Sequence, residues 1–144
     1  MNAQPLENPD ALKAIKWDIA HSSLAYAQTY LLEEKFFDEL FHVYLLNFDL
    51  HILTDHRQKP IAKQLLARYN HLHIRTWSTN RTMHTKTLLF WPSQSLYCGS
   101  HNLTRGSFSM SANTTIRIET PAIFSQYLTL FKAMYDRSRP VTPD

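Results

Sequence analysis

The sequence predicts an α/β fold in which a mixed, mostly parallel β-sheet is flanked by helices on both faces. Three observations indicate it. Short apolar runs alternate with amphipathic segments in the first half of the chain, and strands that alternate with helices usually form parallel sheets. A turn-rich tetrapeptide then separates two strand-like runs, which makes the sheet locally antiparallel. A last strand leads into a long aromatic helix.

In the first half, the predicted helices cover residues 10–17, 33–46 and 59–70 and the predicted strands cover residues 22–31, 50–54 and 71–77. The helix over 33–46 is the clearest, because Phe36, Phe37 and Leu40 recur at helical spacing while Glu34 and Asp38 face outward. Asp10 is the expected N-cap of the first helix.

In the second half, strand-like runs over 83–91 and 96–98 flank Pro92-Ser93-Gln94-Ser95 and predict a hairpin. A final strand over 114–119 is followed by Thr120 as N-cap and Pro121 at the first helical position. The helix that begins there carries aromatic residues as far as Tyr135.

The chain of 144 residues is expected to form a single domain, 1–144, with an ordered core over about 10–137 and short proline-containing tails. Hydrophobic residues make up 44% and charged residues 19%, and no stretch approaches the ~20 apolar residues of a membrane span. The first ten residues lack the basic start and apolar core of a signal peptide. With one cysteine, Cys98, the chain fits a reducing compartment, so a cytoplasmic location without membrane contact is expected.

The residues that can carry chemistry lie in two short segments. His84 and Lys86 are two positions apart on a predicted strand, so their side chains share a face. About one hairpin later, Gly99 allows close backbone approach, and Ser100 and Asn102 follow on alternate positions. A phosphodiester site needs a cation, neutral donors and a nucleophile or base, and these side chains supply all three. The net charge of +3 is compatible with a polyanionic partner.

The segments His84-Thr85-Lys86 and Gly99-Ser100-His101-Asn102 resemble the H-x-K and G-S-x-N signature of the phospholipase D superfamily. The flanking residues over 83–90 and 102–104 also look like that family, and the order of elements from about Ser22 to Tyr135 is similar to one copy of its α/β unit. With one motif copy, the chain resembles the family's small bacterial nucleases.

The resemblance implies a phospholipase D/nuclease-like fold and a phosphodiesterase, with nucleic acid, DNA or RNA, as substrate. It implies His84, Lys86, Ser100 and Asn102 as catalytic residues, with Lys86, Ser100, Asn102 and Gly99 binding substrate. One histidine attacks phosphorus to form a phosphohistidine and a second protonates the leaving oxygen. A chain with one copy must therefore form a homodimer, and the covalent route needs no metal or cofactor.

Two positions depart from the family pattern. The aspartate usually found five residues after the lysine is replaced by Trp91, or by Pro92 if the loop carries an insertion. A glutamate common two residues after a later asparagine is also missing, since Thr115 occupies that place after Asn113. Glu119 is a candidate for orienting His84. These losses leave turnover, more than phosphate binding, as the open question.

Alternative readings remain open. The chain could be a nucleic-acid-binding module with weakened catalysis, or a phosphodiesterase of lipids or small molecules. His101 occupies the variable motif position and is expected to be structural filler. His71 and His73 share a strand face, but no carboxylate or third histidine follows at a recognisable spacing, so no metal site is predicted. Side chains that could follow a nucleic-acid backbone or stack on bases are Arg75, Arg81, Arg105, Arg117, Trp77 and Trp91.

Overall fold

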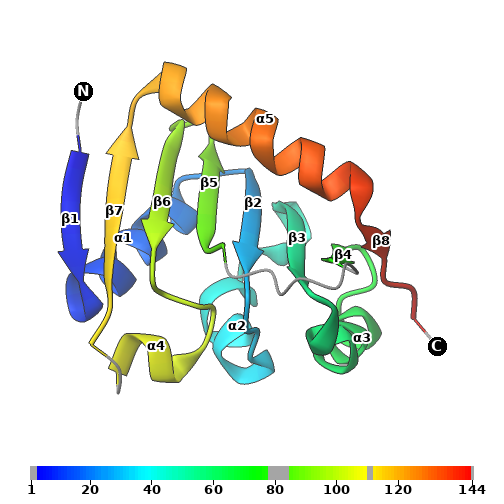
Figure 1. The fold of residues 1–144 in the computed structure, drawn as a ribbon. Coiled ribbons are helices and arrows are strands. Elements are labelled where there is room, and N and C mark those ends of the chain that lie inside the picture. Colours follow the sequence, from blue (N-terminus) through cyan, green and yellow to red (C-terminus); the bar gives the residue numbers. More distant parts are fainter. Residues whose placement is uncertain (1–2, 78–84, 110–111, 144) are drawn as a thin grey trace.

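The computed structural model describes residues 3–77, 85–109 and 112–143. Within them the chain forms a mixed sheet of eight strands in the order β1-β7-β6-β5-β2-β3-β4-β8 (Figure 1). The strands are β1 Ala3–Glu7, β2 Leu24–Thr29, β3 Asp49–Asp55, β4 His73–Trp77, β5 Thr87–Trp91, β6 Ser95–Gly99, β7 Thr114–Glu119 and β8 Arg139–Pro140.

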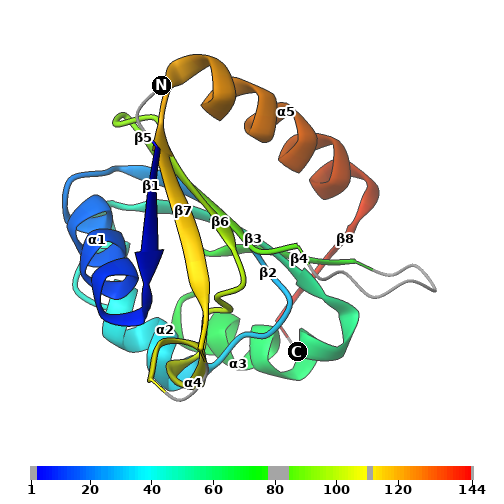
Figure 2. The same cartoon turned by 60° about the vertical axis from the view of Figure 1, so that its left-hand side comes forward.

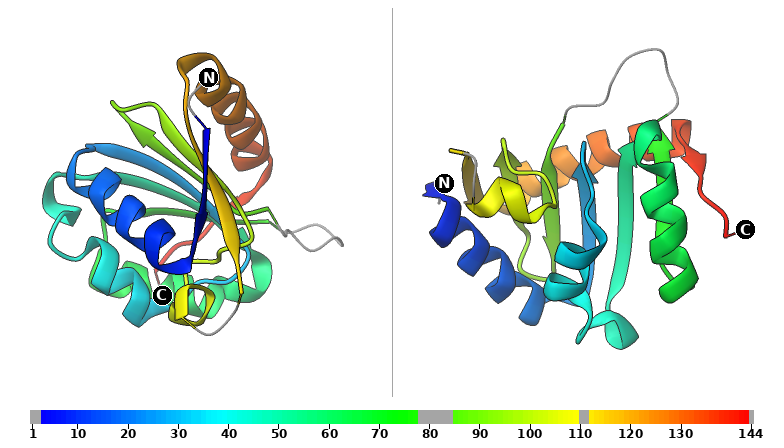
Figure 3. Two further views of the ribbon diagram at one scale, coloured as in Figure 1. Left: turned by 90° about the vertical axis from the view of Figure 1, so that its left-hand side faces the viewer. Right: turned by 90° about the horizontal axis from the view of Figure 1, so that it is seen from below.

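Helices cover both faces of the sheet. They are α1 Asn8–Ala20, α2 Glu34–Phe41, α3 Lys59–Arg68, α4 Arg105–Ser109 and α5 Pro121–Arg137, with short 3-10 turns η1 Leu45–Asn47 and η2 His56–Gln58. Figures 2 and 3 show α5 alone on one face, with α1 to α4 on the other. No helix in the described ranges is long and apolar enough to span a bilayer.

Strand alternation divides the core into two layers. On β5, Leu88 and Phe90 pack toward α1 to α4, whereas Leu89 packs toward α5. On β3, Ile52 and Leu53 divide in the same way. Successive strand side chains point to opposite faces, so an apolar residue at each position serves a sheet that is covered on both sides.

The helices bury narrow apolar stripes. In α2 the buried residues are Phe36, Phe37, Leu40 and Phe41, which recur at helical spacing. The much longer α5 fully buries only Phe124 and Phe131, seven residues apart. This long helix therefore lies across the sheet with much of its surface exposed.

The predicted α/β class, with a mixed sheet and helices on both faces, is confirmed. The prediction that the sheet is mostly parallel is wrong for the described residues. Only β2–β3 and β3–β4 pair in parallel, whereas the other five pairings are antiparallel. β5 and β6 form a hairpin, and β1, β7 and β8 also join the sheet in the antiparallel direction. Antiparallel strands can follow each other after a short connection, as β5 and β6 do.

The prediction that both termini are loose tails is also wrong for the described residues. The N-terminal strand β1 pairs along its whole length with β7, and Leu6 in it is buried. At the other end, β8 pairs with β4 and Val141 is buried. Proline is tolerated at sheet edges, which explains why the prolines that suggested loose ends are compatible with these strands.

Several element boundaries agree and others shift. β7 covers the predicted residues, and α5 begins at Pro121 as expected. The first helix begins at Asn8, so Asp10 lies in its first turn instead of capping it. The helix predicted over 33–46 ends at Phe41. Among the described residues of the predicted strand over 83–91, the strand begins at Thr87.

Candidate active site

The two motif segments meet at one end of the sheet, where the central strands β2 and β6 end and β5 begins. In the strand register, Gln28 of β2 lies opposite Thr87 of β5, and Thr87 lies opposite Cys98 of β6. The backbone N–H of Gly99 donates to the carbonyl of Lys86 at 3.4 Å. The structure therefore brings Lys86 beside the glycine that opens the second segment. His84 lies outside the described residues.

Lys86 is half-buried and precedes β5 directly. Its Nζ lies 6.0 Å from the centre of the Tyr30 ring, and the guanidinium of Arg57 lies 5.7 Å from the same centre. Two cations therefore flank one aromatic ring at this end of the sheet. Arg57 was not singled out from the sequence, because only the fold brings η2 next to the end of β2.

Asn102 is held by its carboxamide oxygen. The Oδ1 atom accepts a hydrogen bond of 2.9 Å from the backbone N–H of Leu31, and the Thr29 hydroxyl oxygen lies 3.5 Å from it. Among the described residues no hydrogen bond from Nδ2 is present, and a carboxamide nitrogen carries two donors. The arrangement therefore fixes the side chain by its acceptor and leaves its two donors without a partner among the described residues.

Thr29 positions the loop that carries Asn102. Its hydroxyl is fully buried, donates to the Leu31 carbonyl at 2.7 Å and accepts from the Leu103 backbone N–H at 3.1 Å. An isolated bridge between Leu32 and Leu103 continues this contact. No local sequence pattern indicates this role, because Thr29 and Leu103 lie more than seventy residues apart in the chain.

Ser100 is bonded to the neighbouring strand. Its hydroxyl donates to the Thr114 carbonyl at 3.1 Å and accepts from the Thr114 backbone N–H at 3.0 Å. A serine hydroxyl has a single proton, which this bond uses. The described contacts therefore give Ser100 the task of extending the β6–β7 pairing beside Asn102.

Gly99 is required by close packing of β7. A Cβ atom at this position would lie 2.6 Å from the Cα of Thr115 and would also collide with the Thr114 carbonyl oxygen. The sequence correctly indicates close backbone approach at Gly99, but the approaching backbone belongs to a neighbouring strand.

His101 points into the protein, away from Asn102. Its Nε2 lies 2.7 Å from Asn8 Oδ1, and its ring stacks on Phe108 with centroids 4.4 Å apart. Burial lowers the pKa of this imidazole, because the charged form would lose its hydration. Its Nδ1 is buried without a hydrogen-bond partner among the described residues. This placement agrees with the expected structural role.

A small cavity connects the site to the missing acidic residue. It has a volume of about 20 Å³, enough for one water molecule, and its lining includes Lys86, His101 and Thr115. Thr115 is buried and lies opposite Gly99. The position where the family commonly carries a glutamate therefore lines the same cavity as Lys86, and a neutral hydroxyl occupies it.

Two other predicted positions lie at the opposite end of the sheet. Glu119 is opposite Ser95 at the far end of β6, is exposed, and bonds to Arg117. Because His84 lies outside the described residues, the expectation that Glu119 orients it stays a prediction. Trp91 ends β5 at that same far end, is 44% exposed, and precedes a cis peptide bond to Pro92.

Three of the arginines considered for nucleic-acid binding have intramolecular partners. Arg105 pairs with Glu39. Arg75 donates to the hydroxyl and carbonyl oxygen of Ser138. Arg117 pairs with the fully buried Asp18, which also accepts from the Tyr97 hydroxyl. This burial and hydrogen bonding raise the pKa of Tyr97. These contacts support structural roles. Arg81 lies outside the described residues.

Comparison with known proteins identifies the family of this chain. Residues 16–135 match the family described as "Cardiolipin synthase, PLD-like domain". No curated protein sequence matches the chain.

Among solved structures, NucT from Helicobacter pylori is 13% identical with a TM-score of 0.81, covering 96% of this chain and 98% of NucT. Nuc from Salmonella typhimurium, a phospholipase D family member, is 16% identical with a TM-score of 0.79, covering 99% of both chains. TrmBL2, an archaeal chromatin protein with a novel mode of DNA binding, is 10% identical with a TM-score of 0.70, covering 98% of this chain and 54% of TrmBL2. At these identities the similarity concerns the fold.

Proposed function

Because this chain belongs to the phospholipase D superfamily, we propose that it is a metal-independent nuclease that cleaves DNA or RNA with low sequence specificity. At the family level the chain is a hydrolase of phosphodiester bonds. The observation that carries the proposal is that Lys86 lies beside the Gly99–Asn102 segment at one end of the sheet. An ammonium group and a fixed amide donor suit a phosphodiester, whose non-bridging oxygens are anionic acceptors.

In the proposed mechanism His84 is the nucleophile. Its imidazole nitrogen attacks phosphorus, the bond to the leaving oxygen breaks, and the partner's His84 gives that oxygen a proton. Water then attacks the phosphohistidine, the partner's His84 takes the water proton, and the P–N bond breaks. Lys86 and Asn102 stabilise the negative charge that develops on the non-bridging oxygens.

The shared site requires a homodimer in this proposal. The chain has one H-x-K segment, and the mechanism needs two histidines. Leu31 supports an interface near the site, because it is 40% exposed and its backbone bonds to Asn102. Sedimentation of the active protein should give about twice the chain mass. An active monomer would contradict the shared site.

The direct test is cleavage of labelled single-stranded DNA and RNA in EDTA. We expect the wild-type chain to cleave and His84→Ala to be inactive. His21→Ala is the matched control, because His21 is an exposed histidine that bonds to Trp17 at the end of α1. Cleavage by His84→Ala at the wild-type rate would remove the proposed nucleophile.

A second candidate is a nucleic-acid-binding module with little turnover. The observation that favours it is the buried Thr115 in place of an acidic residue in the cavity that Lys86 also lines. Oligonucleotide binding without cleavage over prolonged incubation would support this alternative. Parallel hydrolysis assays on cardiolipin and phosphatidylcholine vesicles test for a lipid phosphodiesterase, which would hydrolyse the lipids and not the oligonucleotide.

We also propose a cytoplasmic location. Its support is the single cysteine, Cys98, which is not paired in a disulfide.

A further inference from the structure

A second cluster of polar side chains lies far from the candidate active site. It consists of Asp49 and His51 on β3 and His73 on β4, near the amino ends of these strands. Lys86, in contrast, adjoins the carboxyl end of β2, which runs parallel to β3. The cluster therefore occupies the opposite end of the sheet.

The strand register brings the three side chains together. His51 and His73 are direct cross-strand partners, and Asp49 precedes His51 by two residues, so all three project from the same face. The sequence suggested His71 and His73 as a pair instead. The Nε2 atom of His71 lies 2.8 Å from the Leu45 carbonyl, so that ring is engaged elsewhere.

The distances between donor atoms match a metal site. His51 Nε2 lies 3.2 Å from one carboxylate oxygen of Asp49, and His73 Nε2 lies 3.5 Å from the other. One ligand atom from each residue lies within 4.8 Å of the others. Bonds of about 2.0–2.1 Å in a tetrahedron require ligand atoms about 3.3 Å apart. These atoms are close enough to surround one ion once the half-exposed His73 ring turns out of its parallel stack on His51.

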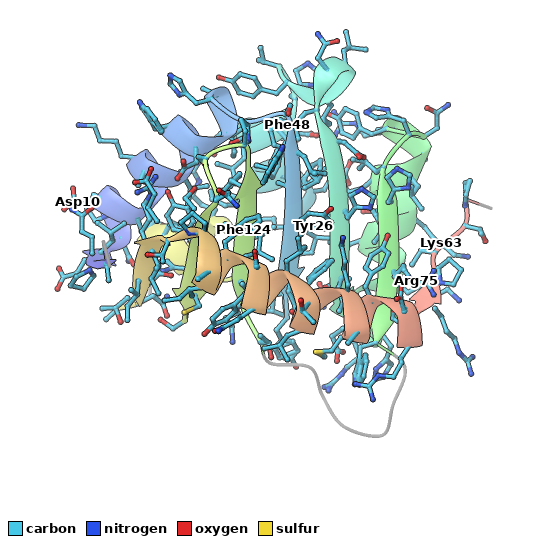
Figure 4. All side chains as sticks on the ribbon, turned by 90° about the horizontal axis from the view of Figure 1, so that it is seen from above. Asp10, Tyr26, Phe48, Lys63, Arg75 and Phe124 are labelled. Atoms are coloured by element: carbon cyan, nitrogen blue, oxygen red, sulfur yellow. The ribbon has the colours of Figure 1, made fainter. Side chains whose placement is uncertain are left out.

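Packing holds His51 in place. Its ring stacks on Tyr26 at 5.3 Å on one side and on His73 at 4.4 Å on the other, and it meets the edge of Tyr135 from α5. Figure 4 labels Tyr26 and shows α5 passing over this face. The side chain of His51 is 22% exposed, whereas Asp49 and His73 are about half exposed. An ion could therefore enter from solvent onto a fixed ligand.

The surrounding charges are mixed. Asp49 is the anion of the cluster and contributes to the raised pKa of Tyr26. Lys132 lies 5.8 Å from the Tyr26 ring centre, and Arg75 lies 5.2 Å from the Tyr135 ring centre. Binding must therefore come from direct coordination to the donor atoms, because the surroundings are not strongly negative.

We propose that Asp49, His51 and His73 bind one divalent transition-metal ion of the zinc type. Two imidazole nitrogens and one carboxylate oxygen suit Zn²⁺, Co²⁺ or Ni²⁺, whereas Mg²⁺ and Ca²⁺ prefer oxygen ligands. Water completes the coordination. The ion links β3 to β4 at the end of the sheet away from Lys86 and takes no part in phosphodiester cleavage.

The test measures Zn²⁺ binding to the full-length, tag-free chain by equilibrium dialysis. We expect one Zn²⁺ per wild-type chain, and affinities at least about tenfold lower for His73→Gln and Asp49→Asn, because both changes remove a direct ligand. His56→Gln is the matched control, since His56 is an exposed histidine at the other end of β3. It should bind Zn²⁺ as the wild-type chain does.

Co²⁺ absorption and thermal unfolding provide independent readouts. Bound Co²⁺ should give the intense visible bands of a four-coordinate ion, and Zn²⁺ should raise the Tm of the wild-type chain and not of His73→Gln. Equal Zn²⁺ binding by the wild-type chain and His73→Gln, or no binding by either, would overturn the proposal and leave only Asp–His hydrogen bonds. Cleavage in EDTA would be unaffected, so this result is separate from the nuclease test.

Discussion

Replacing Asn102 by aspartate separates its two roles. The carboxamide oxygen accepts from the Leu31 backbone N–H, and a carboxylate oxygen can accept the same bond. The Nδ2 amino group, however, is replaced by an anionic oxygen that cannot donate a hydrogen bond. We therefore expect Asn102→Asp to fold normally while losing its interaction with a phosphodiester.

The magnitude follows from the lost hydrogen bond. A hydrogen bond to a charged group contributes about 1.5–3 kcal/mol, which corresponds to a loss of about 10- to 150-fold in kcat/KM. Repulsion between the new carboxylate and the phosphate adds to this loss. The reduction for Asn102→Asp should therefore be at least as large as the reduction for Asn102→Ala.

Stability should show the reverse order. Asn102→Ala removes the acceptor of the Leu31 N–H; because this hydrogen bond is exposed and water can replace it, the free energy of unfolding should fall by about 0.5–1.5 kcal/mol. For a chain of this size, that corresponds to a fall in Tm of about 2–4 °C for each kcal/mol. Asn102→Asp should unfold near the wild-type temperature.

The assay combines initial rates of cleavage of a fluorescent oligonucleotide in EDTA with thermal unfolding of the same samples. Wild-type activity in Asn102→Asp would refute the role of the Nδ2 donors. A Tm of Asn102→Asp as low as that of Asn102→Ala would show that the acceptor bond had not been kept.

Three further predictions concern stability and assembly. Asp18→Asn removes the carboxylate that pairs with Arg117 in the interior, and it should lower the free energy of unfolding in urea by about 3–5 kcal/mol; a loss below about 1 kcal/mol would contradict a buried ion pair. Because burial lowers the pKa of His101 below 6.5, the unfolded state binds a proton that the folded state does not, and stability falls as pH drops below that value. His101→Gln should lose less stability than the wild-type chain in urea titrations at about pH 7 and about pH 5, whereas equal losses would exclude His101 as a source of acid sensitivity. Leu31→Asp should convert the proposed dimer to an inactive monomer in sedimentation, whereas Leu130→Asp, also at an exposed leucine, should not; a dimeric Leu31→Asp would place the interface elsewhere.

Local sequence signals predicted the elements best where they agreed with packing. β7 has its predicted bounds, and Pro121 begins α5. Thr120 precedes that helix as expected but makes no capping hydrogen bond with its side chain. The parallel content was overestimated, because strand direction depends on pairing partners that are distant in sequence. β1, for example, pairs with a strand about 110 residues later.

The candidate site was predicted in part, for the same physical reason. The resemblance singled out Lys86 and Asn102, and the strand register brings their segments together. Thr29 and Arg57 were missed because neither belongs to a local motif. His51 was missed because its partner, His73, lies on another strand, and only the register shows that they are neighbours.

The most direct test of the central claim is mass spectrometry of the chain denatured at alkaline pH during turnover of an oligonucleotide in EDTA. A covalent intermediate predicts a phosphate-linked adduct on the peptide that contains His84. The adduct should be lost on acid treatment and absent in His84→Ala. Cleavage in EDTA with no adduct on that peptide, or with an adduct on another residue, would contradict the proposed mechanism.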